Sequence, residues 1–171
     1  MRKEGENIFM MKRRVSFFVS YAKANKVAVD QFLQLYREQI GASKRFSYAL
    51  WTDHEIVVGD NWNQSIQNAI EETDFGILLV SPAFLNSVYI ASNELPSYLK
   101  ASGKRCFPVM LANVDLERHD LKGLEQKQIY RLDSIKLKQP RAFTYLKDLR
   151  KAQFVEEFFA KVDDWLHENH M

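Results

Sequence analysis

Cysteine is nearly absent from this chain of 171 residues, and Cys106 is its sole example. A single cysteine excludes an intramolecular disulfide and a metal site built from several cysteines. Cys106 lies in a segment predicted to be a buried strand, so we expect an inert core thiol that suits a reducing compartment. The length favours one domain with a core that needs no disulfide or metal for support.

Several common site motifs are also missing. The chain has no Gly-x-Gly-x-x-Gly sequence and no Walker loop, so the standard nucleotide-binding loops are excluded. Its four histidines show no metal-binding spacing with other ligands. No apolar run approaches the length needed to cross a membrane, and residues 1–14 hold too few apolar residues for a signal peptide. We expect residues 1–13 to be a disordered leader, with Met1, Met10 and Met11 as candidate starts.

Charge of one sign is not in large excess, because the formal net charge is +2. This balance excludes a general signature of nucleic-acid binding. Lysine and arginine nevertheless outnumber acids between Lys100 and Lys151. Two interpretations stay open, namely a solvated face and a patch for a phosphate-bearing ligand or an acidic partner.

What the chain does have is a regular alternation of predicted strands and helices. Short apolar or β-branched runs predict strands, and apolar residues at helical spacing predict helices. The predicted strands are 15–20, 46–51, 75–80, 105–111 and 128–132, and the predicted helices are 25–40, 61–72, a stretch from 82 to about 94, 97–101 and 152–167. This order predicts an α/β fold with a flavodoxin-like open five-stranded parallel sheet, order 2-1-3-4-5, and helices on both faces.

Such sheets bind ligands at the carboxyl ends of their strands, near the point where the strand order reverses. Here that point lies between Ser20-Tyr21 and Ser81-Pro82, where Ser81 is the expected N-cap of the next helix. Glu94 follows on that helix and is the one acid between Asp74 and Asp115. Ser87 lies two helical turns before it and would share its face. Glu94 is therefore the candidate for the chemistry, against the alternative of a surface glutamate.

A second unusual feature is the segment from Trp51 to Trp62, which is long for a strand-to-helix loop. It contains the consecutive apolar residues Ile56, Val57 and Val58. Apolar side chains on such a loop favour a partner contact or a lid.

Four segments together resemble a Toll/interleukin-1 receptor (TIR) domain of the bacterial kind. They are Val15-Ser-Phe-Phe-Val-Ser-Tyr21, Leu50-Trp-Thr-Asp-His-Glu-Ile-Val-Val-Gly59, Trp62-Asn-Gln-Ser-Ile-Gln-Asn-Ala-Ile70, and Leu78 to Ser87 followed by Asn93-Glu94-Leu-Pro96. The resemblance extends from about residue 15 to 166, and it implies a single TIR-like domain over residues 14–168 with a tail at 169–171.

The resemblance implies an enzyme that cleaves the nicotinamide–ribose bond of NAD+, a glycohydrolase or an ADP-ribosyl cyclase, without metal or cofactor. It assigns Glu94 as the catalytic carboxylate, which would stabilise an oxocarbenium ion. It implies a substrate-binding set of Tyr21 on the nicotinamide side, Ser81 or Ser87 near the ribose, and Ser20, Asp53, Phe84 and Tyr89. It also implies self-association through the BB loop, at Ile56, Val57, Val58 and Gly59.

Two positions depart from the family pattern. Asn25 replaces the acid that often follows the first segment, and Ile90 stands where a tryptophan is frequent, four residues before the glutamate. Tyr89 is the expected substitute, unless the helix has a different register.

Other functions stay open at this point. Many TIR domains are non-catalytic adaptors that act by association, and a phosphate-binding or receiver domain is a further alternative. A receiver needs clustered acids at the ends of strands one and three, which here are Ser20-Tyr21 and Ser81-Pro82. The resemblance implies NAD+ and other TIR protomers as partners, together with a separate effector or sensor, in the bacterial cytoplasm, with no membrane or direct nucleic-acid contact.

Overall fold

The structure is a computed structural model and describes residues 11–53, 59, 61–100 and 103–169. Its strands are β1 (Arg13–Ser20), β2 (Phe46–Trp51), β3 (Phe75–Val80) and β4 (Cys106–Met110). Its α-helices are α1 (Lys26–Gly41), α2 (Trp62–Glu72), α3 (Pro82–Asn86), α4 (Pro96–Leu99) and α5 (Asp148–Asn169), with a π turn at Ile90–Glu94 and 3-10 turns at Lys23–Asn25, Leu124–Gln126 and Phe143–Tyr145. None of the helices in the described segments is long and apolar enough to span a membrane.

The four strands form one parallel sheet in the order β2-β1-β3-β4. In register, Phe17 of β1 lies opposite Leu50 of β2 and Phe75 of β3, and Leu78 of β3 lies opposite Pro108 of β4. The α/β class, the parallel arrangement and the relative order of these strands agree with the sequence prediction.

The fifth strand predicted at residues 128–132 is wrong for the described structure, in which this segment makes one isolated bridge to the sheet, Tyr130 to Val109, and a second bridge away from it, Leu132 to Arg141. Tyr130 donates its amide to the Pro108 carbonyl at 2.8 Å and accepts from the Met110 amide at 2.9 Å. The next hydrogen bond of a parallel ladder would start at the amide of Pro108, which has no N–H. In the other direction, the Leu132 amide donates to Arg141 instead. The ladder therefore cannot extend either way.

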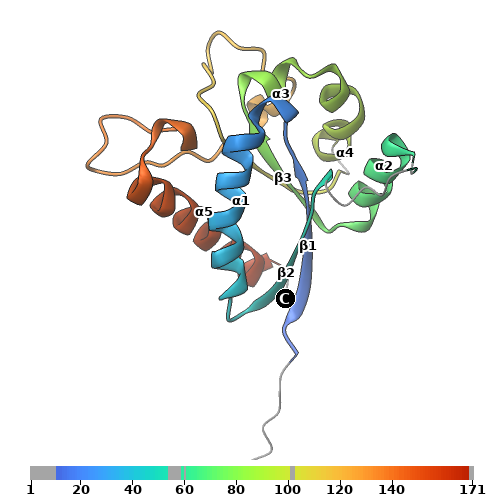
Figure 1. Cartoon of the computed structure of the whole chain (residues 1–171), viewed down its shortest axis with the longest axis horizontal. Helices are drawn as coiled ribbons and strands as arrows, with labels where there is room; N and C mark the ends of the chain where they lie inside the picture. The colour runs from blue at the N-terminus through green and yellow to red at the C-terminus, as the bar shows by residue number, and fades with distance from the viewer. Residues whose placement is uncertain (1–10, 54–58, 60, 101–102, 170–171) are drawn as a thin grey trace, which may run out of the picture.

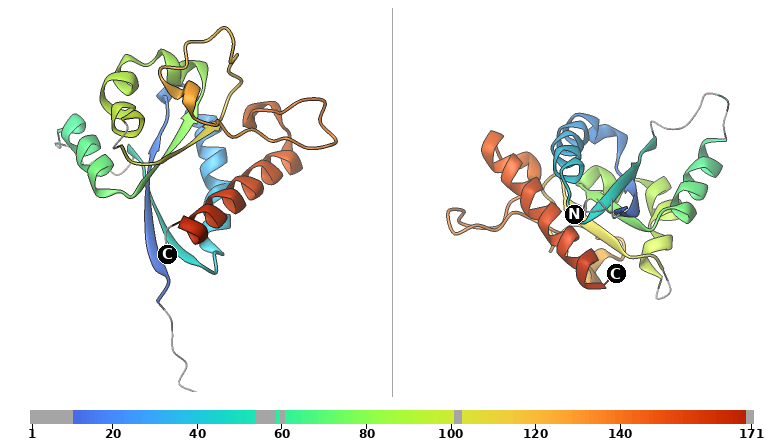
Figure 2. Two further views of the ribbon diagram at one scale, coloured as in Figure 1. Left: turned by 180° about the vertical axis from the view of Figure 1, so that it is seen from behind. Right: turned by 90° about the horizontal axis from the view of Figure 1, so that it is seen from below.

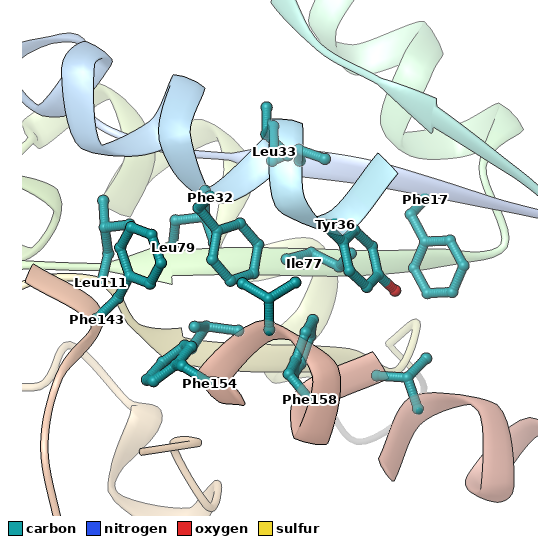
Figure 3. Packing of buried hydrophobic residues seen from close by; sticks show 14 of the residues in the cluster. Phe17, Phe32, Leu33, Tyr36, Ile77, Leu79, Leu111, Phe143, Phe154 and Phe158 are labelled. Carbon is teal, nitrogen blue, oxygen red and sulfur yellow. The ribbon is translucent and has the colours of Figure 1, made fainter. Parts of the chain in front are cut away.

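Helices cover both faces of the sheet, with α1 and α5 on one side and α2 to α4 on the other (Figures 1 and 2). Alternate residues of the strands supply the two cores, so Phe17 and Val19 face α1 and α5 whereas Phe18 faces α2. Figure 3 shows the first core, where aromatic rings of α1 and α5 meet over β3. In it, the rings of Phe32 and Phe158 lie 5.9 Å apart. Because both faces of the sheet are covered, the inner strand β3 is buried along its whole length and contains no polar side chain.

The helix predicted after β3 begins as expected but is not continuous. Ser81 is the N-cap and accepts a hydrogen bond from the Phe84 amide at 3.0 Å. Helix α3 then ends at Asn86, and the Ser87 side chain accepts from the Ile90 amide at 3.2 Å to start the next segment. The predicted two-turn relation between Ser87 and Glu94 on one α-helix is therefore wrong, because a helix end and a π turn lie between them.

Candidate active site

A cavity of about 300 Å³ opens at the carboxyl ends of β1 and β2. Side chains from these two strand ends form one side, and α2 with the segment 87–94 forms the other. Its lining consists of Phe18, Val19, Tyr21, Ala22, Lys23, Trp51, Asp53, Trp62, Ile66, Ser87, Tyr89, Ile90 and Glu94. The sequence predicted a site at the ends of β1 and β3, whereas the described strand ends around this cavity are those of β1 and β2.

The one deeply buried carboxyl group of the lining belongs to Glu94, which is 6% exposed. The Ser20 hydroxyl at the end of β1 donates to Glu94 Oε2 at 2.8 Å. Burial is the largest cause that raises the pKa of Glu94 to about 7; the Ser20 hydrogen bond opposes this rise, and the charge of Asp53 adds a smaller contribution to it. Glu94 thus gains or loses its charge near neutral pH.

Tyr21 and Asp53 form a second polar pair in the cavity, because the Tyr21 hydroxyl donates to Asp53 Oδ1. Burial and this hydrogen bond raise the pKa of Tyr21, so its hydroxyl stays protonated as a donor. The bond joins the first residue after β1 to the second residue after β2. Asp53 is half-buried and lines the cavity together with Tyr21.

An aromatic wall faces these polar groups. The rings of Trp62 and Tyr89 lie 4.4 Å apart, and the Tyr89 hydroxyl donates to Asn63 Oδ1 at 2.8 Å. Lys23 Nζ lies 5.0 Å from the centre of the Trp62 ring. The cavity therefore combines carboxylates, two contacting aromatic rings and one cation, a combination suited to a flat, partly positively charged ligand.

The sequence prediction missed part of this lining. Helical spacing placed Trp62 on the inward face of its helix, yet it is 38% exposed and lines the cavity. A signal was available, because an aromatic residue in the first turn of a helix after a long loop lies at the carboxyl edge of a parallel sheet. Lys23 and Trp51 carried no pattern of their own that pointed to a site.

The predicted site residues divide into those that the structure brings together and those that it does not. Tyr21, Asp53, Ser87, Tyr89 and Glu94 line one cavity, with Ser20 hydrogen-bonded behind Glu94. Ser81 and Phe84 are almost fully buried away from it, as a helix cap and a core residue. Of the four predicted contact residues, Ile56, Val57 and Val58 lie outside the described residues. Gly59 is exposed, with a positive φ of 97° that favours glycine.

The family model of the TIR domain matches residues 17–146, which is more than half of the chain. The chain belongs to the TIR family. A comparison with curated protein sequences finds no significant match. The family assignment is consistent with the parallel sheet and the helices that cover it.

The two departures from the TIR pattern have structural counterparts. Asn25 accepts a hydrogen bond from the Ser81 hydroxyl and so joins the start of α1 to the start of α3. Ile90 and Tyr89 both line the cavity, because the chain between them and Glu94 forms a π turn. The described segments of this TIR domain contain no group of three or more histidine, cysteine, aspartate or glutamate side chains placed to hold a metal ion.

Proposed function

We propose that this TIR domain cleaves the nicotinamide–ribose bond of NAD+, as an NAD+ glycohydrolase or ADP-ribosyl cyclase. The observation that carries the proposal is the carboxyl group of Glu94, which is 6% exposed and lies in a cavity beside an aromatic wall. The TIR family includes NAD-cleaving enzymes, and the match over residues 17–146 supports the same chemistry here.

The chemistry requires one anion at the reacting carbon. The bond between ribose C1′ and the nicotinamide nitrogen breaks, and its electron pair returns to the positively charged ring, which leaves neutral. Positive charge then develops on C1′ and the ring oxygen of the ribose. The ionised Glu94 carboxylate would stabilise this charge in a low-dielectric site, where such interactions are strong. Water adds to C1′ with release of a proton and gives ADP-ribose, whereas an internal nucleophile gives a cyclic product.

The other groups of the cavity would orient the substrate. Tyr21 and Tyr89 would contact the nicotinamide ring, and the Ser20 hydroxyl would hold the Glu94 carboxylate through the hydrogen bond of 2.8 Å. Ser87 and Asp53 offer polar atoms for ribose hydroxyls from the cavity lining. No further cofactor is needed, because the leaving group already carries positive charge.

The test compares Glu94→Gln with the parent protein in NAD+ turnover, with products identified by mass spectrometry. Removing the group that balances the developing charge should cost about 3–4 kcal/mol, which is a loss of 100-fold or more. The matched control is Glu71→Gln, an exposed glutamate of α2, which should keep the parental rate.

Turnover by Glu94→Gln within about tenfold of the parent would refute the catalytic assignment. A parent protein that cleaves no NAD+ at any concentration but associates with itself would favour the alternative, a non-catalytic adaptor. The wider role that we propose is anti-phage immune signalling in the bacterial cytoplasm, with activity that depends on TIR–TIR association and on a separate sensor or effector.

A further inference from the structure

The segment that carries Glu94 has an extra residue in its helical turn. The Leu95 amide donates to the Ile90 carbonyl at 2.9 Å, so the hydrogen bond spans five residues instead of four. This bond belongs to a π turn over Ile90–Glu94. Single π turns are uncommon inside helical segments, but those that occur are often found at functional sites.

The π turn decides which side chains enter the cavity together. Tyr89 and Glu94 both line it, although they are five positions apart. In an α-helix of 3.6 residues per turn, side chains five positions apart diverge by about 140°. A turn closed by a bond between positions five apart brings them back to one side. The aromatic ring and the carboxylate therefore share the cavity because of this turn.

Pro96 contributes to this geometry from the following turn. It is the first residue of α4 and has no N–H to donate to a preceding carbonyl. Its ring would also clash with the carbonyl four residues earlier in a regular α-helix. The widened turn just before it therefore relieves a conflict that the sequence itself creates.

Two amide side chains support the turn. Asn93 Nδ2 donates to the Tyr89 carbonyl at 3.1 Å, and Gln67 Nε2 donates from α2 to the Asn93 carbonyl at 2.8 Å. Both contacts are partly buried, and each gives a backbone carbonyl at or beside the π turn a hydrogen-bond donor. Neither Gln67 nor Asn93 belongs to the cavity lining.

We propose that Gln67 and Asn93 are positioning residues that hold the π turn and thereby direct the Glu94 carboxylate to the reacting carbon. This inference rests on the proposed function in one respect, because it takes Glu94 as the reacting carboxylate. Gln67 follows Ile66, which lines the cavity. Two consecutive residues of α2 therefore contribute to the cavity wall and bind the backbone of the π turn.

The test uses Gln67→Met, which keeps the size of the side chain and removes its donor. The matched control is Gln64→Met, one turn earlier on α2, whose exposed amide contacts Asn68 on the same helix. We expect Gln67→Met to lower kcat about tenfold with KM within about twofold of the parent, because the lost hydrogen bond leaves a partly buried carbonyl unpaired. Gln64→Met should keep both parameters.

A second readout does not need catalysis. NMR titration of the Glu94 side-chain carboxyl carbon in the parent and in Gln67→Met reports its environment directly. A loosened turn admits water, so the pKa of Glu94 should fall by about half a unit or more toward its ordinary value. Asn93→Leu is the second variant and should move the titration in the same direction.

The outcomes separate this inference from the proposed function. A Glu94 titration that is identical in parent, Gln67→Met and Asn93→Leu overturns the inference, and parental kcat in both variants does so as well. If the Glu94 titration shifts in the two variants but the parent protein cleaves no NAD+, the positioning of Glu94 is supported and the proposed reaction is refuted. A fall in both kcat and the Glu94 pKa supports both.

Discussion

Glu94 is the residue at which folding and the proposed chemistry make opposite demands. A carboxyl group that is 6% exposed is more stable as the neutral acid, and burial therefore raises its pKa to about 7. The proposed reaction needs the same group as an anion. The Ser20 hydroxyl, which donates to it at 2.8 Å, favours the charged form and partly offsets the burial.

The first prediction at this scale concerns pH. Because the anion is the active form, kcat/KM should rise as the pH increases through about 7 and level off above it. Bound NAD+ brings positive charge near the carboxylate and lowers its pKa, so the midpoint for kcat should lie at lower pH than that for kcat/KM. Rate profiles from pH 5 to 9 check this order. A profile that falls with rising pH would assign Glu94 as an acid instead.

The second prediction concerns stability. The pKa of Glu94 rises from an ordinary 4.5 to about 7 in the folded protein, so its stabilising contribution is present below 4.5 and is lost as the pH rises to 7. Glu94→Gln removes the buried charge and should raise the free energy of unfolding by about 1–3 kcal/mol at pH 8, with little gain at pH 4. Urea unfolding at both pH values measures it, and an equal change at both would contradict the cause.

Individual residues were predictable from sequence where they were exceptions in their surroundings. Glu94 is the one acidic residue between Asp74 and Asp115. Cys106 lies within an apolar run and is buried as predicted. Trp62 was misplaced because periodicity marks apolar residues as inward without distinguishing a core from a cavity. That distinction depends on the neighbouring Tyr89 and Lys23, which no local pattern relates to it.

At the scale of elements, sequence patterns predicted what local chemistry decides. Strands β2 and β3 have the predicted bounds, and α2 begins at the predicted place, with Asn61 as its N-cap. The predictions are wrong where a proline lacks the backbone N–H that the regular hydrogen-bond pattern would use. Pro108 limits a fifth strand to one bridge, and the turn before Pro96 widens into a π turn. Both effects depend on which backbone N–H and C=O groups can pair between segments, and hydrophobic spacing does not reveal this.

The third prediction concerns how α2 is held. Lys104 Nζ donates to the carbonyls of Ile70, Glu71 and Thr73 at the end of this helix. Such a cation pairs the last carbonyls and complements the helix dipole. Lys104→Met should therefore lower the free energy of unfolding by about 1–2 kcal/mol. The control Lys100→Met, at an exposed neighbour, should change it little, and equal losses in the two variants would contradict the capping role.

At the scale of the whole molecule, the two-faced α/β arrangement determines where a site can form. Consecutive parallel strands deliver their carboxyl ends to one edge, and the segments that follow β1 and β2 meet there at Tyr21 and Asp53. The class, the four observed strands and their relative order followed from the sequence. The exact composition of the cavity did not, because side chains from four separate segments form it.

The fourth prediction concerns association, which is typical of TIR domains. Three consecutive β-branched residues in the sequence between β2 and α2, Ile56 to Val58, motivate it. NAD+ turnover per milligram should rise steeply with protein concentration or on tethering. Ile56→Asp or Val58→Asp should abolish the rise with native circular dichroism, since an unpaired carboxylate in a contact costs several kcal/mol. Specific activity that is independent of concentration in the parent would show that each protomer holds a complete site.

Pro108 makes the two edges of the sheet unequal in their capacity to pair with a further strand. On the β4 side, the missing amide N–H and the short contact with Tyr130 leave no continuous row of donors for an incoming strand. On the other side, β2 is the terminal strand of the order. Exposed strand borders are templates for pairing with another chain. A strand from another chain can therefore pair with the β2 edge of the sheet but not with a continuous β4 edge. This asymmetry opposes the assembly of many copies through both edges of the sheet.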